Sequence, residues 1–188
     1  MPIEIAEEPR PDPTEYARVP ISFEVRSVMD VTAADDGGFT LSERAIDPPY
    51  VKDYDVLDGP ETWAQFDLTN WGWFAAHRDG RRVGGAAVAF DTPGVHMLEG
   101  RRDLAVLWDI RVVPDVRGHG AGAALFRAVE AWAAARGCRE LKIETQNINV
   151  PACRFYARMG CRLAAIDPTA YPTLPDEVQL LWLKDLAG

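Results

Sequence analysis

Residues 117–122 read Arg117-Gly118-His119-Gly120-Ala121-Gly122 and separate two segments of different periodicity. The apolar run before them, 105–113, is typical of a buried strand, whereas the alanine-rich segment after them predicts a helix that opens near His119. A strand that turns through glycines into a helix leaves backbone N–H groups pointing at one small volume, where the helix N-terminus adds roughly half a positive charge. Glycines also carry no Cβ that would block an anion. The loop therefore predicts a diphosphate-binding site.

Glycine-rich turns of this kind also bind dinucleotides, and some only redirect the chain. The stretch 118–122 does not spell G-x-G-x-x-G, and no Lys-Ser/Thr pair of a P-loop follows it. A dinucleotide fold would also need an acidic residue about 20 positions further on for the ribose. Glu140 stands there by count, but at the start of the next expected strand, so the Rossmann interpretation is the weaker alternative.

Length and composition limit the classes of function. The 188 residues suit one domain with a sizeable core. A formal net charge of −9 without a dense Lys/Arg stripe argues against a nucleic-acid partner and favours a cationic one. No run reaches the ~18 to 20 apolar residues of a membrane span, and the acidic, proline-rich start is unlike a secretory signal. We therefore expect a cytoplasmic protein that does not bind membranes.

The cysteines and histidines predict no metal. Cys138, Cys153 and Cys161 are an odd number without C-x-x-C spacing, which argues against a disulfide framework and a zinc site. They are typical of small buried side chains. The three histidines show no ligand spacing either.

The first hundred residues give uneven signals. Residues 1–19 are proline-rich and predict a flexible arm or an extended strap ahead of a single domain over 20–188. Alternation predicts a strand at 21–28, and short helical pieces are expected at 40–46 and 61–68. The runs 71–77 and 82–90, joined by Asp79-Gly80, predict a hairpin.

The second half alternates strands and helices. After the strand at 104–113 and the glycine loop, Leu125, Val129 and Trp132 recur at helical spacing up to Gly137. A strand at 141–145, a helix capped by Asn149 and ended by Gly160, and strands at 162–166 and 178–183 follow. The order predicts an α/β or α+β fold: a mixed, mostly antiparallel sheet flanked by helices, with a parallel pair at the glycine loop, where the ligand should bind.

Two motifs together resemble the GCN5-related N-acetyltransferase family. Arg117-x-x-Gly120-x-Gly122 satisfies its Arg/Gln-x-x-Gly-x-Gly/Ala signature, and Asn149-x-x-Ala152-x-x-Phe155-Tyr156, followed by Gly160, matches its second signature. The similarity spans roughly 104–183. Cys161 departs from the family, which usually has Phe there. Within the family, the chain looks most like the streptothricin acetyltransferases, which acetylate the lysine-like tail of an antibiotic. The similar segments are Trp108-Asp109-Ile110, Glu144-Thr145-Gln146-Asn147 and 167–171.

The resemblance implies acetyl-CoA as co-substrate and no metal. The strands 104–113 and 141–145 would splay apart and admit the pantetheine arm as an added strand. Arg117 could serve the diphosphate as a charged donor or be only a solvated loop arginine, and Asn149 could bind the arm as well as cap its helix. The implied cofactor-binding residues are Ile110, Arg111, Val112, Arg117, Gly118, His119, Gly120, Ala121, Gly122, Ala123, Asn149 and Tyr156.

The resemblance also implies acid and base groups. A lysine-like amine is about 99.9% protonated at pH 7, so a base must remove a proton. Glu144 occupies the position where related members carry a general base, and Asp109 is the second candidate; Glu144 could instead only bind substrate or be structural. Tyr156 would protonate the leaving thiolate, unless it is a core tyrosine.

The acceptor is less well defined. Residues 47–67 contain six carboxylates and one basic residue, Lys52. This charge excess is typical either of an acidic lid that attracts a polycation or of a solvated face. Trp71 and Trp73 fall on one face of their strand and are expected in the core, with a cation-π wall for the acceptor as the alternative. The expected function is direct acetyl transfer to a primary amine of a small cationic acceptor, such as a streptothricin-type antibiotic. A protein amine, another amine drug or a non-catalytic acyl-CoA-binding sensor are alternatives, and a homodimer is a further expectation.

Overall fold

The computed structural model describes residues 2–35 and 37–186. The described residues form two compact units, one from residues 2–22, 53–141 and 185–186 and one from 23–35, 37–52 and 142–184. Within the described residues, one sheet has the strand order β1-β4-β5-β6-β7-β9-β8, and β2 and β3 pair separately. The sheet is mostly antiparallel, β6 and β7 are its parallel pair, and helices flank it, so the predicted fold class is confirmed.

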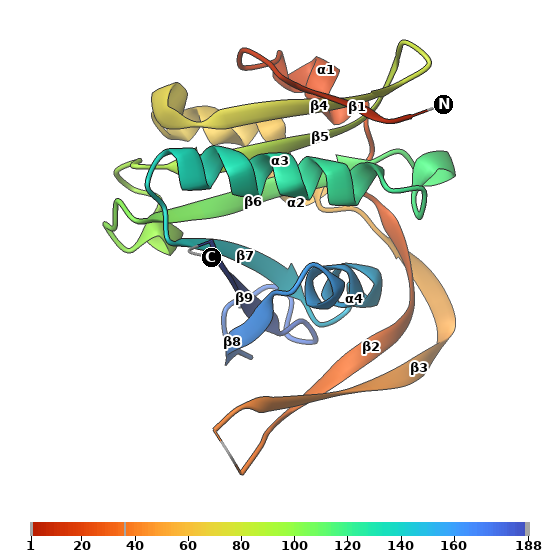
Figure 1. Ribbon diagram of the computed structural model, residues 1–188. Coiled ribbons are helices and arrows are strands. Elements are labelled where there is room, and N and C mark those ends of the chain that lie inside the picture. Colours follow the sequence, from red (N-terminus) through yellow and green to blue (C-terminus); the bar gives the residue numbers. More distant parts are fainter. Residues whose placement is uncertain (1, 36, 187–188) are drawn as a thin grey trace. The chain divides into compact units, whose positions relative to one another are not determined.

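The main helices and strands of the first unit begin and end close to the predicted positions (Figure 1). Asp79 and Gly80 both have positive φ, which a two-residue hairpin turn with the native twist requires, and the predicted hairpin is confirmed. A 3₁₀ helix at Pro60–Gln65 covers much of the predicted helical piece at 61–68. The elements are β1 (Glu4–Glu7), α1 (Pro13–Ala17), α2 (Asp55–Asp58), β4 (Gly72–Arg78), β5 (Arg81–Phe90), β6 (Leu104–Val112) and α3 (Ala121–Ala135).

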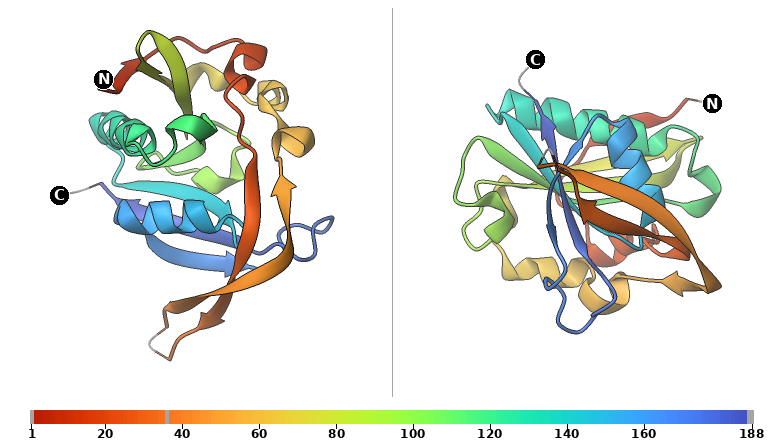
Figure 2. Two further views of the ribbon diagram at one scale, coloured as in Figure 1. Left: turned by 90° about the vertical axis from the view of Figure 1, so that its right-hand side faces the viewer. Right: turned by 90° about the horizontal axis from the view of Figure 1, so that it is seen from below.

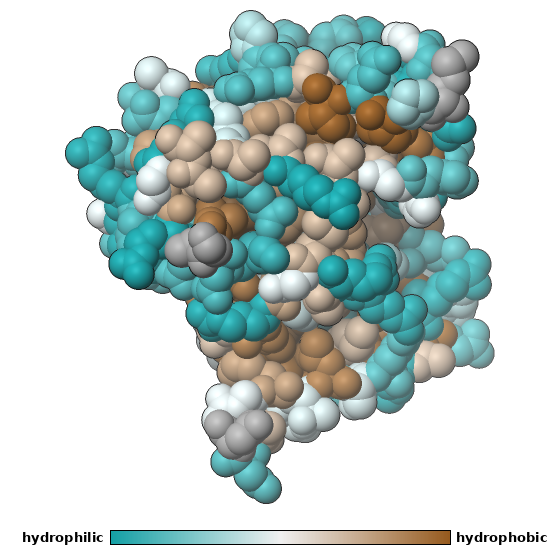
Figure 3. Space-filling model, viewed as in Figure 1, coloured by the Kyte–Doolittle hydropathy of each residue, from teal (hydrophilic) through white to brown (hydrophobic). Residues whose placement is uncertain are grey.

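Helix α3 covers one face of β4, β5 and β6 with the predicted apolar side chains. Leu125 and Val129 are fully buried, and Trp132 is 6% exposed. A Cβ on Gly72 would come within 2.6 Å of the Trp132 ring, so glycine in β4 makes room for the indole. The outer face of α3 carries alanines beside exposed Arg127, and pale brown side chains lie over this helix in Figure 3. The helix thus fixes the position of the glycine loop at its N-terminus.

The N-terminal residues form defined elements of the first unit. Strand β1 pairs antiparallel with β4, from Glu4 opposite His77 to Glu7 opposite Phe74. Asp12 caps α1, whose first residue is a proline, a position where the missing N–H costs nothing. Proline restricts the unfolded chain as well, so ordering this segment costs less conformational entropy than its irregular sequence suggests.

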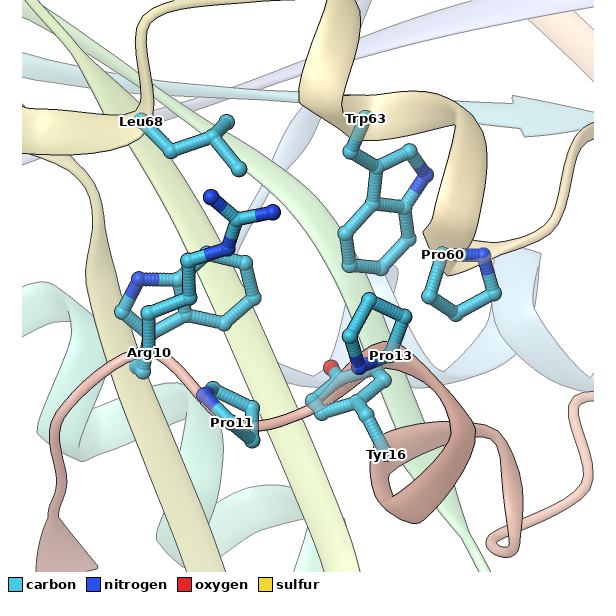
Figure 4. A pocket seen from close by; sticks show the side chains of 8 residues that line it. Arg10, Pro11, Pro13, Tyr16, Pro60, Trp63 and Leu68 are labelled. Carbon is cyan, nitrogen blue, oxygen red and sulfur yellow. The ribbon is translucent and has the colours of Figure 1, made fainter.

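Tyr16 anchors the N-terminal segment in the core. Its side chain is 1% exposed, and its ring lies 5.5 Å from that of Trp63 and 6.1 Å from that of Trp73 in edge-to-face arrangements. Figure 4 shows Pro11, Pro13 and Tyr16 beside Trp63 in a pocket of this unit. Trp71 and Trp73 are buried in the same aromatic cluster, as predicted.

The second unit contains a long hairpin and the end of the large sheet. The hairpin forms a twisted ribbon (Figure 2). The helical piece predicted at 40–46 is wrong, because residues 40–45 pair with β2 and are strand. Local propensity there is weak, and the partner strand decides the conformation. The elements are β2 (Phe23–Ala33), β3 (Phe39–Lys52), β7 (Glu140–Gln146), α4 (Val150–Arg158), β8 (Arg162–Asp167) and β9 (Gln179–Asp185).

The hairpin is attached to the rest of the second unit beside α4. The backbone N–H of Met29 donates to the carbonyl of Asn147 at 2.9 Å, and Arg154 forms an ion pair with Glu43. Asn149 caps α4 by accepting from the N–H of Ala152, as predicted. In the described part of the chain, no helix has the length and apolar character needed to cross a membrane.

Candidate active site

The glycine loop connects β6 to α3 through a 3₁₀ turn at Pro114–Val116. Gly118 and Gly120 have φ of 80° and 91°, a region that other L-residues rarely adopt. An added Cβ at either position would meet no atom within 4 Å, so backbone conformation and not crowding selects glycine here. The first N–H groups of the 15-residue helix have no partner within it. An exposed loop with bare glycines at such a helix end fits the diphosphate of a nucleotide cofactor.

Arg117 braces this loop. Its guanidinium donates to the backbone carbonyl oxygens of Val112, Ser22 and Pro20 at 2.8, 3.0 and 3.2 Å. Burial lowers its pKa from the ordinary value. The side chain therefore connects the loop to the segment before β2. That the guanidinium also donates to the diphosphate stays a prediction. His119 contacts the Arg117 carbonyl through Nδ1.

Strand β6 carries a buried ionic cluster. Asp109 and Arg111 are two residues apart and thus lie on the same face of the strand. Arg111 donates to both carboxylate oxygens of Asp109, at 2.9 and 2.7 Å, and to both of Asp55, at 2.8 and 3.0 Å. The Tyr16 hydroxyl donates to Asp109 at 2.7 Å. The exposed fraction of the side chain is 1% for Arg111 and 4% for Asp109.

The pKa values of Arg111 and Tyr16 are shifted by these contacts. Burial acts to lower the pKa of Arg111, but the charge and hydrogen bonds of Asp109 and the hydrogen bonds to Asp55 raise it above its ordinary value. Burial, followed by the charge of Asp109, raises the pKa of Tyr16. Asp109, the second candidate base, is therefore held by a permanent cation and a neutral phenol. The main-chain groups of Ile110, Arg111 and Val112 lie in the same strand, next to a bulge between Leu107 and Asp109.

Strand β7 carries a different carboxylate cluster, built from neutral donors. Glu144 and Gln146 share one face of the strand. The Tyr171 hydroxyl donates to Oε1 of Glu144 at 2.6 Å, and Gln179 Nε2 donates to Oε2 at 2.9 Å. Gln146 Nε2 donates to the Tyr171 oxygen at 3.0 Å. Burial, then the charge of Glu144 and its hydrogen bond, raise the pKa of Tyr171.

The second unit also holds the other predicted residues of the acetyl-transfer chemistry. Tyr156 lies on α4 with a side chain 5% exposed, and its ring is 5.2 Å from that of Phe155. Asn149 begins the same helix. Glu144, Asn149 and Tyr156 thus belong to one unit, whereas the glycine loop, residues 110–112 and Asp109 belong to the other. The sequence gives no local signal for Gln179, and it marks Tyr171 only through the resemblance of the segment 167–171.

The acidic segment 47–67 is divided between structural and exposed groups. Asp55 is paired with Arg111, and Asp67 caps a 3₁₀ turn through the N–H of Thr69. Val56 and Leu57 in α2 are 81% and 57% exposed beside these carboxylates. Among the described residues, no group of three or more His, Cys, Asp or Glu side chains is arranged to hold a metal ion.

Comparison with known proteins gives a family match and close relatives. The sequence model of the Acetyltransferase (GNAT) family matches residues 42–161. A streptothricin acetyltransferase of Escherichia coli is 34% identical over 163 residues, which are 85% of this chain and 83% of that protein. A streptothricin acetyltransferase of Streptomyces lavendulae is 33% identical over 153 residues, 80% of this chain and 76% of its own.

Solved structures share the fold over nearly the whole chain. A nourseothricin acetyltransferase is 28% identical, with a TM-score of 0.73 and 98% of both chains covered. A protein from Bacillus anthracis str. Ames, solved in complex with acetyl coenzyme A, has a TM-score of 0.79 at 22% identity and covers 98% of this chain and 99% of its own.

Proposed function

The chain belongs to the acetyltransferase (GNAT) family and is an acetyl-CoA-dependent N-acetyltransferase; we propose that its acceptor is a primary amine of a small cationic compound, foremost a streptothricin-type antibiotic. The observation that carries the proposal is the identity of one third to relatives named streptothricin acetyltransferases, over at least four fifths of this chain. The net charge of −9 supports a cationic acceptor.

We assign cofactor binding to two kinds of main-chain group. The N–H groups of residues 117–123 would hold the diphosphate, with Gly118 and Gly120 giving the loop its shape. The main chain of residues 110–112 would pair with the pantetheine amides, in the manner of strand addition. Asn149 would contribute a side-chain hydrogen bond while it caps α4.

We assign the proton transfers to two residues of the second unit. Glu144 would take a proton from the acceptor ammonium, so that the nitrogen lone pair can form the N–C bond with the thioester carbonyl carbon. The C–S bond then breaks, and the thiolate takes the proton of the Tyr156 phenol. The second proton of the nitrogen restores the phenol through solvent. The products are the amide, the thiol of CoA and one released proton.

The surroundings of the two candidate bases favour Glu144 over Asp109. Both oxygens of Asp109 accept charge-assisted hydrogen bonds from buried Arg111, which also pairs with Asp55, so Asp109 is part of a buried structural cluster. Glu144 is held by a phenol and an amide, which are neutral donors and form weaker hydrogen bonds. Asp109 stays the second candidate, and its variant is a necessary comparison.

Direct transfer between the two substrates is the expected route. An acyl-enzyme linked through Cys153 or Cys138 would need an activated thiolate, but burial raises the pKa of Cys153 to about 11 and also raises that of Cys138. Both thiols therefore stay protonated at neutral pH. The reaction needs acceptor and acetyl-CoA bound together, which supplies the advantage of proximity.

The acceptor can be identified with a panel of amines. Purified protein, acetyl-CoA and streptothricin, aminoglycosides, polyamines or lysine peptides would be mixed, and release of the CoA thiol would be followed. Streptothricin should give the highest kcat/KM, and the site of acetylation should be a primary amine by mass spectrometry. Preference for a lysine peptide or for another amine drug would replace the proposed acceptor with one of the alternatives. No turnover with any cationic amine, despite tight binding of acetyl-CoA, would contradict the proposed acceptor class.

A further inference from the structure

The connection between β8 and β9, residues 168–178, is a shaped segment. Prolines stand at 168, 172 and 175. The N–H of Leu174 donates to the carbonyl of Tyr171 at 2.9 Å, and that of Glu177 to the carbonyl of Leu174 at 3.0 Å. Two consecutive turns and three prolines restrict the conformations of this connection.

The last residue of the connection is hydrogen-bonded to Asn147, directly after the end of β7. The N–H of Val178 donates to the side-chain oxygen of Asn147 at 2.9 Å, and the N–H of Asn147 donates to the carbonyl of Val178 at 3.0 Å. These reciprocal bonds fix the register of the connection against the end of β7, three residues beyond Glu144.

A buried ion pair attaches the same connection to the hairpin. Lys52 at the end of β3 pairs with Glu177, and their side chains are 13% and 7% exposed. A pair this buried is favourable only in a good geometry, so it selects one position of the connection over others. The connection is thus held on both sides within the second unit.

This support brings Tyr171 to Glu144. Because the Tyr171 oxygen accepts a hydrogen bond from Gln146, its single proton is directed to Oε1 of Glu144. Gln179, the first residue of β9, holds Oε2. Each oxygen of the Glu144 carboxylate thus accepts from a different residue, and together the two hydrogen bonds fix the plane of the carboxylate. Each oxygen keeps a further lone pair.

We propose that Tyr171 and Gln179 are positioning residues that hold the Glu144 carboxylate in the orientation in which it accepts the proton of the acceptor amine. The connection 168–178, held by Asn147 and by the Lys52–Glu177 pair, is the support for Tyr171. The inference rests on the proposed function of Glu144. It explains why a proline-rich connection that lies outside both family motifs is held at several points.

Other titratable groups lie on the surrounding elements and bear on any pH effect. The replacement Tyr171→Phe changes none of them, so a change in the tyrosine titration of this variant reports the lost phenol. The groups are Lys142 on the same face of β7, Lys52 and Tyr50 on β3, Asp167 on β8, and Asp176 and Glu177 on the connection.

The first test compares Tyr171→Phe and Gln179→Leu with a matched control, Tyr50→Phe, which removes a hydroxyl from an exposed tyrosine of the same unit. Without the Tyr171 hydroxyl, Oε1 of Glu144 loses the donor that orients it. For Tyr171→Phe we expect kcat to fall about tenfold while KM for acetyl-CoA stays constant. Gln179→Leu should lower kcat in the same way, by less. Tyr50→Phe should behave like the unmodified protein.

The second test does not depend on turnover. Burial is the largest cause of the raised pKa of Tyr171, and the charge of Glu144 is the second, so Glu144→Gln should move the titration of one tyrosine to lower pH, as followed by tyrosinate absorbance. Tyr171→Phe should remove that transition. An unchanged titration in Glu144→Gln would overturn the inference, as would an unchanged kcat in Tyr171→Phe or a KM for acetyl-CoA that rises in that variant. Failure of the unmodified protein to acetylate any amine would instead refute the proposed function, and the absorbance test would still report the contact.

Discussion

Asp109 and Glu144 are both acidic residues on central strands, but the two units surround them differently. Asp109 accepts two bonds from Arg111 and one from Tyr16, and Arg111 continues to Asp55. Glu144 accepts from Tyr171 and Gln179, which are neutral. A carboxylate paired with a permanent cation gains stability by staying charged, whereas one held by neutral donors can accept a proton at a smaller cost. Similar residues thus serve architecture in one unit and, we infer, chemistry in the other.

The largest expected effect is on stability in the first unit. Asp109→Ala should lower the free energy of unfolding by about 3 to 5 kcal/mol, because buried Arg111 loses one of its two carboxylates. Urea denaturation would measure it. The control is Asp115→Ala, which breaks an exposed pair with Arg81 and should leave the urea midpoint nearly unchanged. Equal midpoints for the two variants would mean that the buried cluster contributes no more than a surface ion pair.

The next effect separates the two carboxylates by activity. Glu144→Gln should lower kcat about 100-fold or more, since it removes the proton acceptor, and should leave the calorimetric affinity for acetyl-CoA unchanged. Asp109→Asn, assayed at a temperature where it is folded, should keep kcat within a few fold. The reverse pattern, with turnover lost in Asp109→Asn alone, would exchange the roles assigned to the two residues.

Replacing Tyr156 should have a smaller effect. Tyr156→Phe should lower kcat about tenfold, because a thiolate leaves readily even without a proton donor, and the pKa values of a thiol and a phenol differ by only about two units. Affinity for acetyl-CoA, measured by calorimetry, should not change. An identical kcat would leave Tyr156 as a core tyrosine of α4.

The smallest effect concerns the glycine loop, on the cofactor side of the comparison. Gly120→Ala and Gly137→Ala introduce a Cβ at φ of 91° and 80° at opposite ends of α3, both into open space. Each should cost about 1 kcal/mol of stability through backbone strain alone. Only Gly120→Ala should also weaken acetyl-CoA binding, by a few fold in calorimetry. A similar loss of affinity in Gly137→Ala would show that strain, and not loop position, controls binding.

Local signals were enough to predict much of the fold. The Asp79-Gly80 turn, the cap at Asn149 and the glycine loop before α3 each depend on neighbouring residues, and each is found where the sequence places it. The family match and the fold agree with the resemblance carried by these motifs.

Contacts between distant residues account for what the sequence did not predict. Tyr16 is buried because its hydroxyl meets Asp109, 93 residues away, and no local pattern reveals that partner. Residues 40–45 are strand because β2 pairs with them. Tyr171 contacts Glu144, which lies 27 positions earlier in the chain. The roles of the candidate site residues in catalysis and cofactor binding stay predictions, which the variants above test.

The pairing of β1 with β4 also sets the order of events while the ribosome makes the chain. Residues 4–7 are synthesised before their partners, residues 74–77, which follow about 70 positions later, and at typical elongation rates this takes several seconds. During that interval β1 has no partner strand, and Asp109, which accepts from the Tyr16 hydroxyl, has not yet been made. The pairing of β1 is therefore a late step of folding.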